Sequence, residues 1–249
     1  MIELPYLDVE TPFPPVSTAL SEPNGLLAYG ATLDAPRLFN AYSNGIFPWF
    51  SDDEPILWWS PDPRAIIELD DFHLSRSLKK LANRRQYTVT LNQSFDEVIE
   101  ACASIPRMNP HSDAPTTETW IVDDMITAYK RLHQAGIAHS VEVWDEQNNL
   151  AGGLYGVAIG EIFCGESMFH RQPNTSKLAM YALVTHMKKH QLAFIDCQLP
   201  TEHLASLGAK TLPRSTFIER LRKQNGTLDE DGRITAEYRY RWQGGNITP

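Results

Sequence analysis

Hydrophobic and polar residues change their spacing along this chain, and the changes predict the order of its elements. After Ser60, mostly apolar or alternating segments separate segments with helical spacing. The strand-like segments are 65–69, 86–92, 139–144, 150–160, 161–169 and 193–198. The helical segments are 75–85, 95–104, 121–136, 174–191, 201–209 and 214–224, followed by a polar tail. Polar turns between the three strands of 139–169 predict an antiparallel meander.

The first 60 residues have a different texture, rich in proline, glycine and aromatic residues. One helix is expected near 33–45, with Asp34 as its N-cap and Gly45 at its end. We therefore expect a small irregular N-terminal domain, residues 1–62, and a second domain, residues 63–249. In the second domain, three strands, a helix, a strand and a helix follow the order of an N-acetyltransferase-like (GNAT-like) acyltransferase core. The predicted fold class is α/β (α+β).

Charge is distributed unevenly. The window 73–85, HLSRSLKKLANRR, carries +5, which leaves −14 for the rest of a chain whose net charge is −9. Ser75 is a plausible N-cap, and helical spacing separates a stripe of leucines from a stripe of basic residues. Such a stripe is either an ordinary solvated helix face or a phosphate-binding surface, and the acidic remainder of the chain favours the second reading.

Several kinds of chemistry find little support. No secretion signal or membrane span is visible, and the three cysteines are far apart, so we expect a cytoplasmic protein with reduced thiols. Cys164 and Cys197 lack a neighbouring histidine and favour simple packing. His186 and His190, four residues apart, could hold a metal with His203, but the lysines between them favour a solvated face.

Three polar residues lie inside apolar, strand-like segments: Glu166, Asp196 and Gln198. Buried carboxylates need either partners or a chemical task. Two structural alternatives are open, since Glu166 could pair with a buried arginine such as Arg64, and Asp196 could cap a neighbouring helix. A CoA-dependent acetyltransferase is disfavoured because the junction before the long helix, HRQPNTSK, has no glycine for a pyrophosphate loop.

A set of long, aromatic-rich motifs adds a family resemblance. The motifs are GIFPWF (45–50), ILWWSPDPR (56–64), HLSRSLKK (73–80), ETWI (118–121), AHSVEVW (138–144), GGLYGVAIGEIFCGESMF (152–169), NTSKLA (174–179) and IDCQ (195–198). Together, in the same order over about residues 20 to 220, they resemble the leucyl/phenylalanyl-tRNA–protein transferase family.

The resemblance implies a reaction. Leucine or phenylalanine, and methionine less well, would pass from its tRNA to the α-amino group of a protein that begins with arginine or lysine. The product would be marked for degradation. It implies no cofactor and no metal, because an aminoacyl ester is already activated. No membrane partner is expected either.

The resemblance also implies roles for particular residues. Asp196, Gln198 and Glu166 would be catalytic. The tRNA's terminal adenosine would lie against Trp49, Trp120 and Phe163. The amino-acid side chain would enter an apolar pocket formed by Leu154, Met168, Met180, Leu183 and Ile195. The acceptor-stem phosphates would contact Arg76, Lys79, Lys80, Arg84 and Arg85.

The chain departs from the family pattern in three places: a long loop at 105–118, Thr201 where asparagine is common, and Leu183 in place of an aromatic residue. Two rival functions are a CoA-dependent GNAT acetyltransferase and a non-catalytic RNA-binding module. Of the aromatic residues in 45–59, Trp49 is the one expected to touch ligand. Trp58 and Trp59 are adjacent on an extended segment, so at least one of them should be buried.

Overall fold

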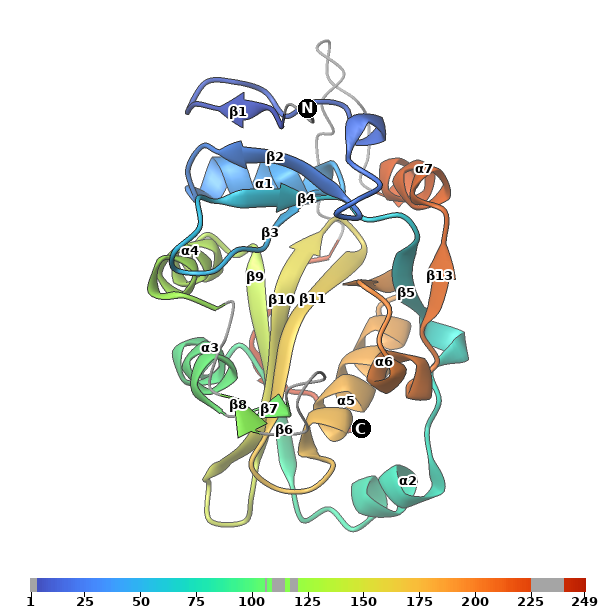
Figure 1. Cartoon of the computed structure of the whole chain (residues 1–249). Coiled ribbons are helices and arrows are strands. Elements are labelled where there is room, and N and C mark those ends of the chain that lie inside the picture. The colour runs from blue at the N-terminus through green and yellow to red at the C-terminus, as the bar shows by residue number, and fades with distance from the viewer. Residues whose placement is uncertain (1–3, 106, 109–114, 117–120, 225–239) are drawn as a thin grey trace.

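A computed structural model describes residues 4–105, 107–108, 115–116, 121–224 and 240–249. Figure 1 shows a small sheet at one end of the molecule and a larger sheet that fills the rest. The small sheet has the order β1-β2-β4-β3 and contains β1 (Tyr6–Leu7), β2 (Leu26–Gly30), β3 (Phe47–Pro48) and β4 (Leu57–Trp59). These four strands all precede residue 62, the predicted domain boundary.

The larger sheet has eight strands in the order β13-β5-β12-β11-β10-β9-β6-β14. Its strands are β5 (Arg64–Glu68), β6 (Thr88–Leu91), β9 (Ala138–Trp144), β10 (Leu150–Ile159), β11 (Ile162–His170), β12 (Phe194–Gln198), β13 (Lys210–Leu212) and β14 (Gly245–Asn246). The predicted meander is confirmed, because β9, β10 and β11 pair antiparallel in sequence order. β12 then joins β11 in parallel, after a helical crossover. A further pair, β7 (Arg107–Met108) and β8 (Pro115–Thr116), stands apart from both sheets.

Helices cover both faces of the large sheet (Figure 1). On one face lie α3 (Phe95–Ser104) and α4 (Asp123–Gln134), together with α1 (Ala35–Ser43) from the N-terminal part. On the other face α5 (Thr175–Lys189) packs against β9, β10 and β11, and α2 (Arg76–Asn83) packs against α5. The short helix α6 (Glu202–Ser206) and α7 (Arg214–Gln224) follow β12, with β13 between them. Two short 3-10 helices, Val16–Thr18 and Leu69–Asp71, complete the described elements.

The predicted caps explain where several helices begin and end. Asp34 accepts a hydrogen bond from the Arg37 N–H at 2.8 Å, and Ser75 accepts one from the Leu78 N–H at 3.2 Å, so both predicted N-caps are confirmed. Asn174 precedes α5 in a left-handed conformation, but its side chain makes no capping bond. The order of three strands, a helix, a strand and a helix is the GNAT-like order predicted from the sequence, and it is confirmed.

The last ten residues correct one expectation. The sequence suggested a polar tail, yet β14 pairs with β6 and Trp242 is only 7% exposed. The indole packs into the layer between the sheet and α5. Within the described part of the chain, none of the helices combines the length and the apolar character needed to cross a bilayer.

Candidate active site

The site is centred on the place where β11 and β12 separate. Their parallel register holds for Phe163↔Ile195 and Cys164↔Asp196, and no later pair follows. Beyond this point, side chains bridge the strands: the Gln198 Nε2 donates to Glu166 Oε1 at 2.9 Å. The β12 register against β5 also shifts between Asp196 and Gln198, and Gln198 has a φ of 56°. A non-glycine residue in this left-handed region is held there by its surroundings, which is common at functional sites.

A buried ion pair fixes the other side of Gln198. Arg64 Nε and Nη2 donate to the two oxygens of Asp196 at 2.8 and 2.7 Å, and the two side chains are 1% and 0% exposed. Asp196 Oδ1 also accepts from the Gln198 backbone N–H at 3.0 Å. Asp196 therefore holds Gln198 through the backbone of Gln198. Arg64 reaches further and donates from Nη1 to the Gly45 carbonyl at 3.2 Å.

These contacts test the two structural alternatives that the sequence raised for Glu166 and Asp196. Arg64 pairs with Asp196 rather than with Glu166, and Asp196 holds the strand end rather than capping a helix. Both alternatives were therefore wrong in detail. Glu166 is left without a described cationic partner, in a partly buried position.

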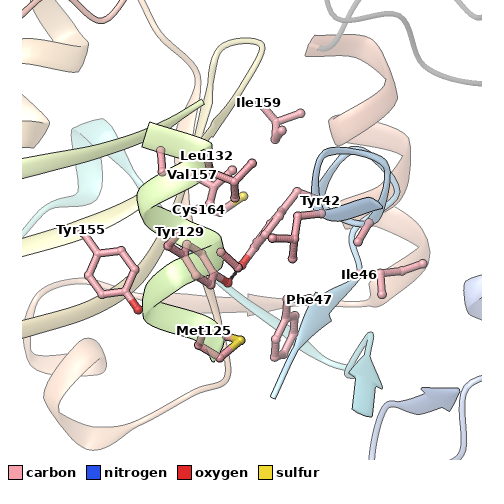
Figure 2. Packing of buried hydrophobic residues seen from close by; sticks show 14 of the residues in the cluster. Tyr42, Ile46, Phe47, Met125, Tyr129, Leu132, Tyr155, Val157, Ile159 and Cys164 are labelled. Carbon is pink, nitrogen blue, oxygen red and sulfur yellow. Dashed lines mark hydrogen bonds between the residues drawn. The ribbon is translucent and has the colours of Figure 1, made fainter. Parts of the chain in front are cut away.

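Two tyrosines hold the second oxygen of Glu166. The Tyr129 hydroxyl, from α4, donates to Glu166 Oε2 at 3.2 Å, and it shares a short hydrogen bond with the Tyr42 hydroxyl from α1. Figure 2 shows these two hydroxyls pointing toward one another between the helices, with Cys164 close by. Burial raises the pKa of both tyrosines well above the usual value, so both hydroxyls stay protonated at neutral pH.

The same surroundings shift the pKa of the Glu166 carboxyl group. Burial raises its pKa from 4.5 to about 7, and the negative charge of Asp196 adds to the rise. The tyrosine hydroxyls and Arg64 act in the opposite direction. A carboxyl with a pKa near neutrality can accept and release a proton under physiological conditions.

Sequence reasoning missed Tyr42 and Tyr129. Both sit on the buried faces of amphipathic helices, where their rings pack like any apolar side chain. The available signal was that each buried ring carries a hydroxyl, and buried hydroxyls usually have a partner. Only the tertiary structure shows that the two hydroxyls meet at Glu166.

The three tryptophans of 45–59 divide as expected. Trp58 is fully buried and donates to the Gly30 carbonyl at 2.9 Å. Trp59 packs beside Trp49, with ring centroids 5.4 Å apart, and donates to the Trp49 carbonyl. Trp49 itself is 39% exposed, which leaves part of its ring free for a ligand. It follows β3, in which Phe47 lies 4.9 Å from the guanidinium of Arg64.

Of the other two predicted adenosine-binding residues, the structure describes Phe163 alone. Trp120 lies outside the described residues. Phe163 is 0% exposed and belongs to the apolar cluster on the α5 face, whereas the aromatic residues around Trp49 belong to the cluster on the opposite face. In this conformation the Phe163 ring is buried, and its contact with the adenosine stays a prediction.

The five residues predicted to form the amino-acid pocket are brought together. Four are buried and one, Met168, is partly buried, all in the cluster between the sheet and α5: Leu154, Met168, Met180, Leu183 and Ile195. Phe163 is the register partner of Ile195 and lies in the same cluster. Two surface hollows, of about 400 and 510 Å³, are lined by none of these residues.

The five basic residues lie on the predicted helix or directly after it. All five side chains are exposed on α2 or on the two residues after it, and no ion pair to any of them is found in the described ranges: Arg76, Lys79, Lys80, Arg84 and Arg85. Leu78 is buried below them. In Figure 1, α2 lies at the opposite end of the molecule from the small sheet. A ligand that touched both Trp49 and α2 would have to be long.

Thiols and histidines show no sign of catalytic use. All three cysteines are buried, and burial raises the pKa of Cys164 and Cys197, so neither forms a thiolate readily. The His186 and His190 rings lie 4.7 Å apart beside Tyr240. Across the described residues, no group of three histidine, cysteine or acidic side chains could hold a metal ion.

The element order is that of a GNAT-like α/β core, and a near-neutral carboxyl bridges two diverging strands in it, which is an arrangement expected of an acyltransferase. The model of the leucyl/phenylalanyl-tRNA protein transferase family matches residues 66–222, and that of its N-terminal domain matches residues 31–62. The chain belongs to the leucyl/phenylalanyl-tRNA–protein transferase family and is an aminoacyltransferase.

Relatives match over nearly the whole chain. The leucyl/phenylalanyl-tRNA–protein transferase of Pseudoalteromonas translucida is 56% identical over 218 residues, which is 87% of this chain and 88% of that protein. That of Chromobacterium violaceum is 50% identical over 238 residues, 96% of this chain and 98% of that protein. Among solved structures, the L-PGS of Bacillus licheniformis has a TM-score of 0.39 and 13% identity, over 72% of this chain and 55% of that one. This last likeness is too weak to add to the assignment.

Proposed function

We propose that the protein transfers leucine or phenylalanine, and methionine less well, from aminoacyl-tRNA to the α-amino group of proteins that begin with arginine or lysine. The modified proteins would then be degraded. Family membership supports the donor and the protein acceptor. The acidic charge outside the basic window favours a cationic acceptor N-terminus.

The observation that carries the proposal is the Glu166–Gln198 bridge across the opening between β11 and β12. The acceptor amine nitrogen attacks the ester carbonyl carbon, and the carbon–oxygen bond to the ribose breaks. The ionised Glu166 takes the proton that the amine loses and returns it to the leaving ribose oxygen. The amide N–H of Gln198 donates a hydrogen bond to Glu166. The amide oxygen of Gln198 is therefore the atom that would accept a hydrogen bond from the acceptor amine and orient it.

The ion pair beneath this bridge has a positioning role. Asp196 holds the backbone of Gln198, and Arg64 neutralises Asp196, so the two carboxylates of the site do different work. Asp196 stays paired with Arg64, and Glu166 changes its protonation state. Two carboxyl groups whose environments separate their behaviour are typical of acid–base sites.

We assign the two ends of the tRNA acceptor to different surfaces. The terminal adenosine stacks on the exposed face of Trp49, and the acceptor-stem phosphates contact the basic side chains of α2. Stacking on an aromatic ring contributes about 1–3 kcal/mol per base and tolerates any base. Phosphate contacts are sensitive to salt and indifferent to sequence. The separation of Trp49 from α2 fits a ligand that spans the length of an acceptor stem.

The test is a transfer assay with radiolabelled leucyl-tRNA and a reporter protein that begins with arginine. Label should move to the reporter, and a reporter that begins with glutamate should stay unlabelled. Trp49→Ala should weaken transfer from a short aminoacyl-adenosine analogue. If wild type moves no label while the charged tRNA stays intact, the proposal is wrong. Acetylation of the same reporter from acetyl-CoA would point instead to a CoA-dependent enzyme, and tRNA binding without transfer to an RNA-binding module.

A further inference from the structure

The C-terminal segment, residues 240–249, closes the layer that holds the predicted amino-acid pocket. Its strand β14 pairs with β6, and the Val89 N–H donates to Thr248 Oγ1 at 2.9 Å. These contacts anchor Trp242, whose indole is stacked at 5.3 Å on His139 of β9. The family match ends at residue 222, so this segment lies beyond it.

Trp242 lies against Phe163 on the pocket side of the sheet. Their ring centroids are 5.3 Å apart, with an interplanar angle of 46°. The ring also packs on Gly156 of β10: a Cβ at Gly156 would lie only 2.5 Å from Phe163 Cε1. The Phe163 ring is therefore in contact with both the strand backbone at Gly156 and the indole.

Phe163 links Trp242 to the pocket. It is the register partner of Ile195, and neighbouring residues in register point to the same face of a sheet. Both side chains are fully buried, in one cluster with Leu154 and Leu183. Because Phe163 contacts both Gly156 and the indole, removal of the indole gives the ring room to move.

We propose that Trp242 is a positioning residue that sets the size of the donor side-chain pocket by holding Phe163 in place. The inference rests on the proposed function. A phenylalanine donor has a larger side chain than leucine and needs more room in an apolar pocket. Removal of the indole should therefore help the phenylalanine donor relative to leucine.

The experiment measures kcat/KM for phenylalanyl-tRNA and leucyl-tRNA with wild type, Trp242→Ala and Trp242→Phe. We expect Trp242→Ala to raise the phenylalanine-to-leucine ratio about tenfold, the lower end of what a methylene-sized change does in such a pocket. Trp242→Phe keeps a ring against Phe163 and should stay close to the wild-type ratio. Trp144→Phe is the matched control, because Trp144 lies at the far end of β9 and packs on the opposite face.

Each outcome decides the matter. If Trp242 had a merely structural role, its removal would lower kcat/KM for both donors by the same factor. An unchanged phenylalanine-to-leucine ratio would therefore overturn the inference. An equal change of the ratio in Trp144→Phe would overturn it as well. If Trp242→Ala does not fold, Trp242→Leu takes its place in the experiment. The same rise of the phenylalanine-to-leucine ratio is expected, since leucine also leaves space beside Phe163. If wild type transfers neither amino acid, the proposed function itself is wrong, which is a separate result.

Discussion

The raised pKa of Glu166 predicts that folding stability falls as the pH rises through neutrality. A free carboxyl with an ordinary pKa of 4.5 releases its proton in the unfolded chain, while the folded chain keeps it until pH about 7. The contribution of Glu166 to stability is therefore complete below pH 4.5 and is lost as the pH passes 7. At about 1.4 kcal/mol for each pKa unit, the loss is about 3 kcal/mol.

Replacement by glutamine removes this dependence, because Glu166→Gln has no proton to lose. Its amide oxygen can still accept from Gln198, and its amide nitrogen can donate to the Tyr129 hydroxyl. At pH 4.5 the variant and wild type should therefore differ by no more than about 1 kcal/mol, the net value of a hydrogen bond. At pH 8.5 the variant should be more stable than wild type by about 3 kcal/mol.

The assay is urea unfolding at several pH values between 4.5 and 8.5, followed by far-UV circular dichroism, with m-values compared between the proteins. Other shifted groups, such as Glu142 and His139, are common to both proteins and cancel in the difference. Glu146→Gln, at an exposed carboxylate in a turn, is the control and should give a flat difference. A flat or falling difference for Glu166→Gln would refute the reasoning. Wild type should also show a rise of kcat/KM through pH 7, and the variant should lack it.

Three further predictions concern the buried ion pair, the basic helix α2 and the N-cap of α6. Arg64→Met leaves Asp196 buried without its partner and should destabilise the protein by about 3–5 kcal/mol in urea unfolding, whereas Arg64→Met with Asp196→Leu should recover most of that stability but not activity. Lys80→Ala with Arg84→Ala should raise the KM for full tRNA and flatten its salt dependence, with little effect on an aminoacyl-adenosine analogue; an equal loss with both substrates would contradict the assignment of α2. Thr201 accepts from the Leu204 N–H at 3.2 Å as the N-cap of α6, so Thr201→Ala should cost about 1 kcal/mol, and an unchanged urea midpoint would exclude that role.

The local pattern of residues was sufficient to predict most of the fold. The caps at Asp34 and Ser75, the alternation in 139–169 and the spacing of the helices all arise from neighbouring residues. The same is true of the basic stripe, because helical spacing alone decides which side chains share a face with Leu78. Interactions within a few residues leave a direct trace in the sequence.

Partners far apart in sequence leave no such trace. Arg64 meets Asp196 across 132 positions, and Tyr42 meets Tyr129 across 87. The sequence could indicate that Asp196 needed a partner, but not which cation would supply it. Trp242 was missed for a related reason: the residues around it are polar, so only its packing shows that the segment is buried.

The N-terminal segment does more than present Trp49 to a ligand. Tyr42 comes from α1, and Gly45 lies two residues after this helix, where its carbonyl accepts from Arg64 at 3.2 Å. Gly45 has a φ of 72°, and a Cβ there would lie 2.5 Å from the Ile218 side chain, so the chain can make this close approach only with glycine. Burial is the main cause of the raised pKa of Glu166, and the Tyr42 hydroxyl of α1 acts against that rise, so the N-terminal segment helps to set the proton affinity of the site. Loosening this segment should therefore change the pH at which transfer begins, in addition to the affinity for tRNA.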